Sequence, residues 1–427
     1  MKRMIKRWFI GFAAVCVLGL WFNSVDAREP IHSTAKAKQA EKPAVSTKAA
    51  SGKASTSNPK KTPAAAEKPP LTTQKSEESQ QPYKAFIVVE AETGMVVEGE
   101  NIHQPCPPAS ITKLMLAAIV LDKLQSGQIH LDDPVTTSAE AASMGGSQVY
   151  LKPGEVFPLE EMMKAVMVAS ANDAAFAVAE FVAGSRSECV QLMNEKAQQL
   201  GMKDSEFSSP HGLPPAPGQK PDISSPYDLA LLARELVKHP LLLSWTSLQT
   251  EPFRNGSLIM RNHNNLMKRF IGMDGLKTGF YREAGYSIVA TAMKGDLRFI
   301  AVVMGSPAAK TRDGIVEAKL NRAFSLYDRI RLVRKGEVID KEVLLPDGVQ
   351  PGIKPIAASD FSYTVLREKR KLLTKSVELP EQVSGSVQQG QRLGQMVIRF
   401  NNEEVGRIDL IAPSAVAKKG FFKRLFD

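Results

Sequence analysis

The stretch SITKLMLAAIVLDKL, residues 110–124, predicts a helix with very few polar positions. A helix that is apolar on all sides is usually buried on all sides, so this one belongs inside a domain. Its start nevertheless carries Ser110 and Lys113, which share one face of a helix. Ser110 could cap the helix while Lys113 points to water, or the two could be a nucleophile and its base. The second interpretation is favoured, because lysine is rarely buried without a partner.

The segments around this helix predict a mixed fold. Residues 84–101 and 286–307 each contain two apolar runs around a turn, Glu-Thr-Gly in the first pair and Lys-Gly-Asp in the second, and we expect four strands there. Residues 159–184 form a second apolar helical region, and SSPYDLALLARELVKHP predicts a third helix that ends at Pro240. We therefore expect an α+β domain over 83–335, with helices packed on an antiparallel sheet.

The N-terminal part of the chain is predicted to direct export. Residues 1–27 combine a basic start, a 15-residue apolar run and small residues before a possible cut, which is the order of a secretory signal. The run is short for a membrane span, which needs about 20 residues. An uncleaved anchor is the alternative, and both interpretations export the rest. Residues 28–82 are dominated by Lys, Ala, Ser, Thr, Pro and Gln and predict a disordered tether.

The C-terminal part has a different texture. Residues 336–413 contain short alternating segments and turn residues, which predict a small all-β domain. In the tail, 414–427, a helix would place Phe421, Phe422, Leu425 and Phe426 on one face with basic residues off it. This pattern is typical of a short amphipathic helix on a membrane surface, and a frayed basic tail is the alternative.

Charge and cysteine content limit the function classes. The formal net charge is +10, but residues 1–82 account for +8 of it, so the folded part is close to neutral and a nucleic-acid partner is not expected. Cys106 and Cys189 would lie in an oxidising compartment, where they could pair or remain as two buried thiols.

Two further motifs follow the serine and lysine. A polar interruption in the second helical region contains S-x-N at Ser170 and Asn172, and K-T-G stands at 277–279 on a predicted strand edge. Each triplet is weak alone, but S-x-x-K, S-x-N and K-T-G together, in this order, are the signature of penicillin-binding proteins and class A β-lactamases.

The chain resembles the low-molecular-weight penicillin-binding proteins of the D-alanyl-D-alanine carboxypeptidase type. The resemblance covers roughly 83–413 and includes the blocks PASITKLM, MGGSQVYLKPGE, VASANDAA, SSPHGL, NHNNLM, DGLKTGF and AGYSIVATA. It implies a β-lactamase/transpeptidase-like catalytic domain followed by a small all-β domain. It also implies peripheral attachment through the tail, at the periplasmic or extracytoplasmic face of the cytoplasmic membrane.

The resemblance also implies a role for each motif residue. Ser110 is the expected nucleophile and Lys113 its base, which must be neutral; burial and a second ammonium, Lys277, would both lower its pKa. Ser170 is the expected proton relay. Asn172, Lys277, Thr278 and Gly279 are the expected substrate-binding residues. The backbone N–H groups of Ser110 and Phe280 are the expected oxyanion hole. No metal or cofactor is implied.

The implied substrate is a peptidoglycan stem peptide ending in D-Ala-D-Ala, with β-lactams as covalent inhibitors. The alternatives are a D,D-endopeptidase that cuts crosslinks and a catalytically silent wall-scaffolding protein. A class A β-lactamase is disfavoured, because no convincing E-x-x-x-N follows the S-x-N motif. His263 could contact substrate, but we expect a loop histidine bonded to backbone, and we expect His211 to be structural.

Overall fold

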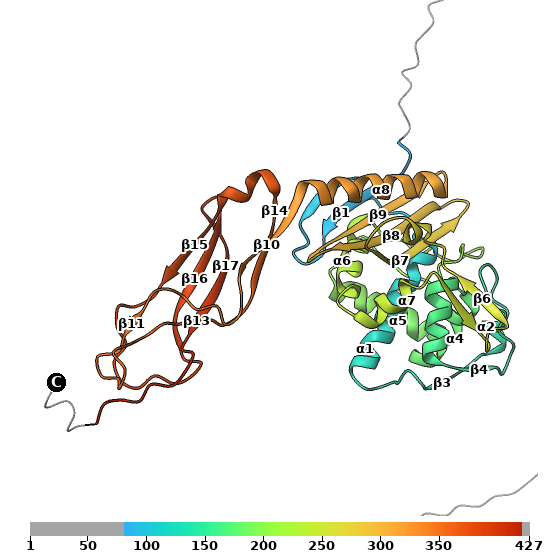
Figure 1. Cartoon of the computed structure of the whole chain (residues 1–427). Helices are drawn as coiled ribbons and strands as arrows, with labels where there is room; N and C mark the ends of the chain where they lie inside the picture. The colour runs from blue at the N-terminus through green and yellow to red at the C-terminus, as the bar shows by residue number, and fades with distance from the viewer. Residues whose placement is uncertain (1–80, 421–427) are drawn as a thin grey trace, which may run out of the picture. The chain divides into compact units, whose positions relative to one another are not determined.

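The computed structural model describes residues 81–420 (Figure 1). The predicted signal, nearly all of the tether and the four apolar residues predicted to face the membrane therefore lie outside the described residues. The centre of the catalytic-type domain is a five-stranded antiparallel sheet in the order β2-β1-β9-β8-β7. Its strands are β1 (Ala85–Glu90), β2 (Val96–Glu100), β7 (Met273–Tyr281), β8 (Gly285–Lys294) and β9 (Leu297–Ser306).

Both faces of this sheet are buried, and the side chains of its strands point alternately into two separate hydrophobic cores. Along β1, Phe86 and Val88 pack under α8 (Ala309–Leu326), while Ile87 and Val89 join the larger core on the opposite face. Successive side chains of a strand point to opposite faces, so a fully buried strand supplies both cores. The antiparallel sheet with helices against it confirms the predicted α+β class.

The larger core lies among the helices below the sheet in Figure 1. Every residue of the first nine in α1 (Lys113–Gln125) is buried, as its apolar sequence predicts. The helices packed with it include α4 (Asn172–Ala183), α5 (Arg186–Gln199) and α6 (Pro226–Leu236). The predicted stop at Pro240 is wrong, because α6 ends at Leu236 and Pro240 begins α7 (Pro240–Thr246), where its missing N–H is not needed.

Short elements complete this helical layer. They are α2 (Ala139–Ala142), α3 (Leu159–Lys164), and two small hairpins, β3 (Pro134–Thr136) with β4 (Val156–Pro158) and β5 (Thr250–Phe253) with β6 (Leu258–Arg261). The hairpins and α2 frame the loop 143–155, which carries the MGGSQVYLKPGE block.

The C-terminal region is all β, as its alternating segments predict. Its four-stranded sheet has the order β13-β17-β16-β15. The strand β10 comes before the predicted boundary at 336, yet it pairs with β14 of this region. The strands are β10 (Tyr327–Val333), β11 (Val343–Leu344), β12 (Gly352–Ile353), β13 (Ile356–Ala357), β14 (Phe361–Leu366), β15 (Leu373–Glu378), β16 (Arg392–Phe400) and β17 (Glu403–Ile411).

The described part of the predicted tail belongs to this β region. Val416 is only 2% exposed and forms a bridge with Val387, while Lys418 forms one with Gly348. Residues 414–420 therefore contain no helix, and any amphipathic helix would have to begin further on. No helix within 81–420 has the length and apolarity that a membrane crossing requires.

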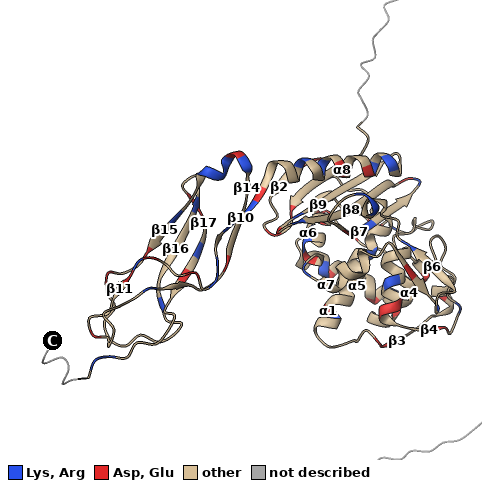
Figure 2. Ribbon diagram, in the orientation of Figure 1, with Lys and Arg blue, Asp and Glu red and all other residues tan. Residues whose placement is uncertain are grey.

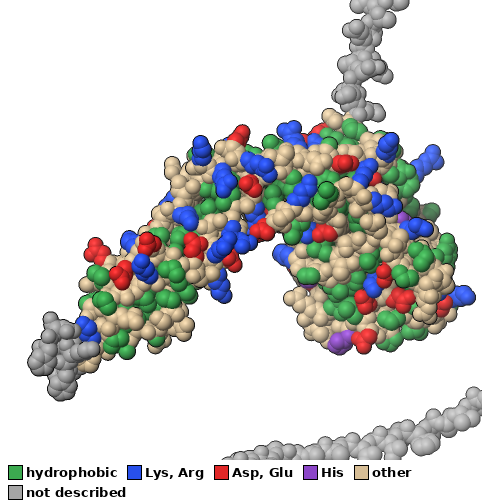
Figure 3. All heavy atoms as spheres, in the orientation of Figure 1, with side chains coloured by type: hydrophobic (Ala, Val, Ile, Leu, Met, Phe, Trp, Pro, Cys, Tyr) green, Lys and Arg blue, Asp and Glu red, His purple; other side chains and the backbone are tan. Residues whose placement is uncertain are grey.

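Cysteines and charges complete the description. Cys106 and Cys189 are both buried and both free, which answers the question that the sequence left open. Burial raises the pKa of the Cys189 thiol to about 12, so it is inert as a nucleophile. Residues of both charge signs are interspersed along the ribbon in Figure 2, as are their side chains over the face shown in Figure 3. The densest basic segment is the 3₁₀ helix Arg367–Leu372, between β14 and β15.

Candidate active site

Ser110 lies in a short 3₁₀ turn, η1 (Ala109–Thr112), that leads directly into α1. Two neighbouring segments press closely on this turn. A Cβ at Gly212 would lie 2.0 Å from the carbonyl oxygen of Ala109, and one at Gly279 would lie 2.3 Å from that of Pro108. Only glycine permits such a close approach, so the loop after α5 and the strand β7 hold the backbone around Ser110 from two sides.

The amine of Lys113 is fully buried and has three neighbours. Its Nζ lies 3.1 Å from Ser110 Oγ, 2.7 Å from Asn172 Oδ1 and 2.6 Å from the carbonyl oxygen of His211. A neutral amine has two N–H donors and one lone pair. The two carbonyl-type oxygens can only accept, so they use both donors, and the lone pair is left for the hydroxyl of Ser110. The contacts fit an ammonium that donates to all three oxygens, and they fit equally well a neutral amine whose lone pair faces the serine hydroxyl.

The electrostatic environment favours the neutral amine. Burial, followed by the nearby ammonium of Lys277, holds the pKa of Lys113 well below its usual value of 10.5. The carboxylates of Asp222 and Asp173 oppose this effect more weakly. These are the two causes that the sequence predicts for an unprotonated base.

Ser170 stands at a break between helices. The chain leaves α3, forms a π-helical turn, η2 (Ala165–Ala169), and then places Ser170 in the left-handed region at φ 59° and ψ 28° before α4 begins. The predicted polar interruption is thus a true interruption of the helix. Ser170 is 2% exposed and lines the same cleft as Ser110. Within the part of the chain that the structure describes, its Oγ forms no hydrogen bond.

Asn172 links the base to the loop 143–155. Its Oδ1 accepts from Lys113, and its Nδ2 donates to the carbonyl oxygen of Gly145 at 2.7 Å. The second hydrogen on Nδ2 remains for another acceptor. The next residue, Asp173, is buried and accepts from the backbone N–H groups of Val149 and Leu151. Asn172 therefore holds the amine of Lys113, and the neighbouring Asp173 holds the loop 143–155.

The K-T-G motif lies on β7, which forms one edge of the sheet within the described residues. Lys277 is 3% exposed and donates to the carbonyl oxygen of Thr278 at 3.1 Å. Burial, and then the guanidinium of Arg312, lowers the pKa of Lys277 to about 7. Arg312, in the first turn of α8, is also buried, and it pairs with Asp313 and donates to the carbonyl oxygen of Ser287. Two buried cations beside a threonine hydroxyl suit a carboxylate.

These elements enclose a cleft of about 260 Å³. It is lined by the predicted residues Ser110, Ser170, Thr278, Gly279 and Phe280. Lys113, Asn172 and Lys277 lie in its buried wall, tied to it by the contacts above. The structure thus brings together every residue proposed from the sequence, although they come from η1, α1, the break before α4, α4 itself and β7.

The two histidines behave differently. His211 is buried, and its Nδ1 accepts from the backbone N–H of Leu213 at 3.1 Å, which is the structural role expected. His263 lines the cleft with Ser110, and its imidazole forms no hydrogen bond with another described residue. The expectation of a loop histidine bonded to backbone is therefore wrong.

Comparison with known proteins identifies the family. The model of the D-alanyl-D-alanine carboxypeptidase family, Peptidase S11, matches residues 72–308, which is more than half of the chain. The chain belongs to this family. A second model, the C-terminal domain of penicillin-binding protein 5, matches residues 327–418 and includes β10, as the strand pairing does.

Individual relatives agree with this assignment. The chain is 35% identical over 342 residues to D-alanyl-D-alanine carboxypeptidase DacF of Bacillus subtilis, covering 79% of this chain and 87% of that protein. Penicillin-binding protein 5 of Haemophilus influenzae has a similar structure, with a TM-score of 0.63, 27% identity and coverage of 79% of this chain and 98% of that one. The ampicillin-bound structure of penicillin-binding protein D2 of Listeria monocytogenes matches at TM-score 0.53 and 29% identity, covering 57% and 98%.

The structure adds cleft residues to this carboxypeptidase that the sequence did not reveal. Arg312 stands in a helix of ordinary amphipathic composition, so its sequence gives no sign that it is buried against the K-T-G strand. Ser147 and Asn265 also line the cleft. Both lie in blocks that carry the family resemblance, MGGSQVYLKPGE and NHNNLM, and this was the available signal for them.

Proposed function

We propose that this chain is a serine-type D-Ala-D-Ala carboxypeptidase that removes the terminal D-alanine from peptidoglycan stem peptides through an acyl-enzyme. The observation that carries the proposal is that Ser110, Ser170 and Thr278 line one cleft, with the fully buried amine of Lys113 3.1 Å from Ser110 Oγ. Family membership and the names of the relatives supply the substrate class.

In the first step, Lys113 Nζ takes the proton from Ser110 Oγ as the oxygen attacks the penultimate carbonyl carbon. The carbonyl oxygen gains negative charge, which the backbone N–H groups of Ser110 and Phe280 stabilise. The C–N bond then breaks, and the proton passes to the departing amine of D-alanine by way of Ser170. The products of this step are an ester on Ser110 and free D-alanine.

In the second step, water attacks the ester carbonyl carbon and the bond from that carbon to Ser110 Oγ breaks. Oγ takes up a proton from the water, and the shortened peptide leaves with a new terminal carboxylate. The terminal carboxylate of the substrate is bound by Lys277, Thr278 and Arg312 during the first step. It departs with D-alanine, so the cleft is open at that side for water. A β-lactam forms the same ester, but its leaving group stays attached and blocks this side.

We also propose that the enzyme is exported and acts outside the cytoplasmic membrane, where peptidoglycan is found. The predicted signal supports export. Peripheral attachment through residues 421–427 is proposed from their apolar face alone, since the preceding residues belong to the β region.

The test is covalent labelling by a fluorescent penicillin, together with mass spectrometry of a muropeptide digest. Ser110→Ala should abolish labelling, while Ser126→Ala, at the C-terminal cap of α1, should label normally. Loss of one alanine from pentapeptides marks a carboxypeptidase, whereas conversion of dimers to monomers marks an endopeptidase. Labelling that persists in a folded Ser110→Ala protein would refute the assignment of the nucleophile.

A further inference from the structure

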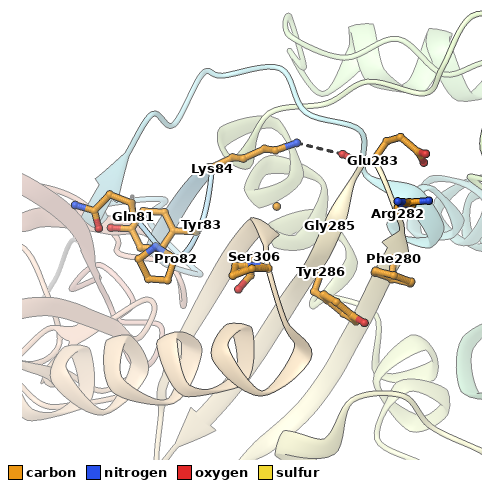
Figure 4. A pocket seen from close by; sticks show the side chains of 12 residues that line it. Gln81, Pro82, Tyr83, Lys84, Phe280, Arg282, Glu283, Gly285, Tyr286 and Ser306 are labelled. Atoms are coloured by element: carbon orange, nitrogen blue, oxygen red, sulfur yellow. Dashed lines mark hydrogen bonds between the residues drawn. The ribbon is translucent and has the colours of Figure 1, made fainter. Parts of the chain in front are cut away.

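A second and larger hollow, of about 960 Å³, adjoins the cleft (Figure 4). It lies between the chain entering β1 and the hairpin that joins β7 to β8. Tyr83 and Lys84 line it from the first side, Arg282 and Glu283 from the hairpin, and Ser306 from the end of β9. None of these five residues has a role in the chemistry proposed above.

The hollow and the catalytic cleft share one wall. Phe280 and Tyr286 line both, and their rings stack with centroids 4.0 Å apart. The two residues face each other across the β7–β8 ladder, so the strand register sets the stack. Phe280 is 52% exposed, so about half of its side chain is accessible to a ligand. A ligand that extends out of the cleft past this pair enters the hollow.

The hollow carries cations that other described residues do not neutralise. Lys84 donates only to the carbonyl oxygen of Glu283, at 3.2 Å, which leaves two of its N–H donors unused. Arg282 forms neither a hydrogen bond nor an ion pair within residues 81–420. Elsewhere in the domain, exposed arginines and lysines often have acidic partners, as Arg331 does with Asp296. The free donors favour an anionic ligand.

The direction of the substrate leads its remaining part to this place. Under the proposed function, the terminal carboxylate lies at Lys277 and Thr278, and the carbonyl under attack lies at the N–H of Phe280. The substrate thus advances along β7 from its C-terminal end toward its N-terminal end. The residues before the scissile bond must then continue toward Tyr281 and Arg282, which is where the hollow opens.

We propose that this hollow is a binding subsite for the acidic, glycan-proximal end of the stem peptide, with Arg282 and Lys84 binding its free carboxylate. Phe280 and Tyr286 form the surface over which the peptide passes from the catalytic cleft to this hollow. This subsite rests on the proposed function, because it takes the orientation of the substrate from it. It makes the enzyme selective for complete stem peptides over short D-Ala-D-Ala mimics.

The experiment compares three substrates that share the same D-Ala-D-Ala end. They are diacetyl-lysyl-D-Ala-D-Ala, a muramyl pentapeptide with a free glutamate carboxylate, and the same pentapeptide with that carboxylate amidated. D-alanine release gives kcat/KM for each. We expect the free-carboxylate substrate to be preferred, and Lys84→Met/Arg282→Gln to reduce that preference about fivefold, mainly through KM.

Controls separate this effect from other causes. Met keeps the aliphatic stem of Lys84, which packs on Gly305. Lys203→Met/Arg322→Gln removes the same charges from exposed positions outside both hollows and should leave the preference unchanged. Lys84→Met/Arg282→Lys keeps the positive charge at position 282 and should therefore retain part of the preference that Lys84→Met/Arg282→Gln loses.

Two results would overturn the subsite. One is an equal preference in the double variant and the wild type, and the other is equal use of the free and amidated pentapeptides by the wild type. A wild-type enzyme that releases D-alanine from none of the three substrates refutes the proposed function instead.

Discussion

Adding one methyl group to Gly279 should impair acylation more than it impairs folding. A Cβ there would lie 2.3 Å from the carbonyl oxygen of Pro108 and 3.2 Å from the Cβ of Ala109, whereas ordinary contacts begin near 3.4 Å. The strand and the 3₁₀ turn must therefore separate by about 1 Å. That movement lies between Ser110 and Phe280, whose N–H groups are the proposed oxyanion hole.

The expected loss follows from this distance. Donors act on an oxyanion within a narrow range near 3 Å, and a misplacement of about 1 Å costs about 100-fold in rate, or ~2.7 kcal/mol of activation free energy. Gly279→Ala should therefore reduce the second-order rate constant of acylation by a fluorescent penicillin about 100-fold.

The assay is the time course of labelling, with thermal unfolding measured in parallel. Gly314→Ala is the matched control, since a Cβ at Gly314 has nothing within 4 Å. It should acylate at the wild-type rate. If Gly279→Ala acylates within threefold of the wild type while remaining folded, the approach of β7 to the turn does not set the oxyanion geometry.

Three further predictions concern charge, the loop and the tail. Because burial lowers the pKa of Lys277 to about 7, kcat/KM should decline above that pH as the charge that binds the substrate carboxylate is lost. In Lys277→Arg this alkaline decline should disappear. A pH profile of the variant that matches the wild type would contradict the assignment of Lys277 as a carboxylate-binding residue. Asp173→Ala leaves the buried N–H groups of Val149 and Leu151 without their acceptor and should lower the unfolding free energy by about 1–3 kcal/mol in urea titration, with Asp173→Asn less affected. Truncation after Gly420 should release the protein from vesicles with its melting temperature intact, whereas truncation after Pro413 removes buried Val416 and should lower it; equal melting of the two would count against the β-region contact.

The sequence predicts those parts of the fold that depend on local pattern. The apolar run of α1, the paired runs of β1–β2 and β8–β9 and the order of the three motifs are all visible without coordinates. The strand β10 is not, because YDRIRLV is mostly half-buried and lacks clean alternation, and it follows a long helix without a turn signal.

The site was predictable to the extent that its motifs were. Lys113 and Lys277 could be paired as two ammonium groups because each belongs to a recognisable triplet. Arg312 belongs to none, and its burial results from the packing of α8 on β8 and β9, a tertiary contact that the residue types of the helix do not specify. The left-handed backbone of Ser170 likewise depends on the π-helical turn before it, which residue types alone do not specify.

The backbone at Ser170 has a consequence for attempts to harden the enzyme against heat. The left-handed conformation costs a residue with a side chain about 1 kcal/mol of stability. Glycine adopts this conformation without that cost, but it has more conformational entropy in the unfolded chain. The two effects oppose each other, so a Ser170→Gly protein would keep the melting temperature of the wild type. It would, however, lack the hydroxyl assigned to proton transfer. Laboratory evolution that selects for thermal stability alone would therefore retain this variant, which is stable but inactive.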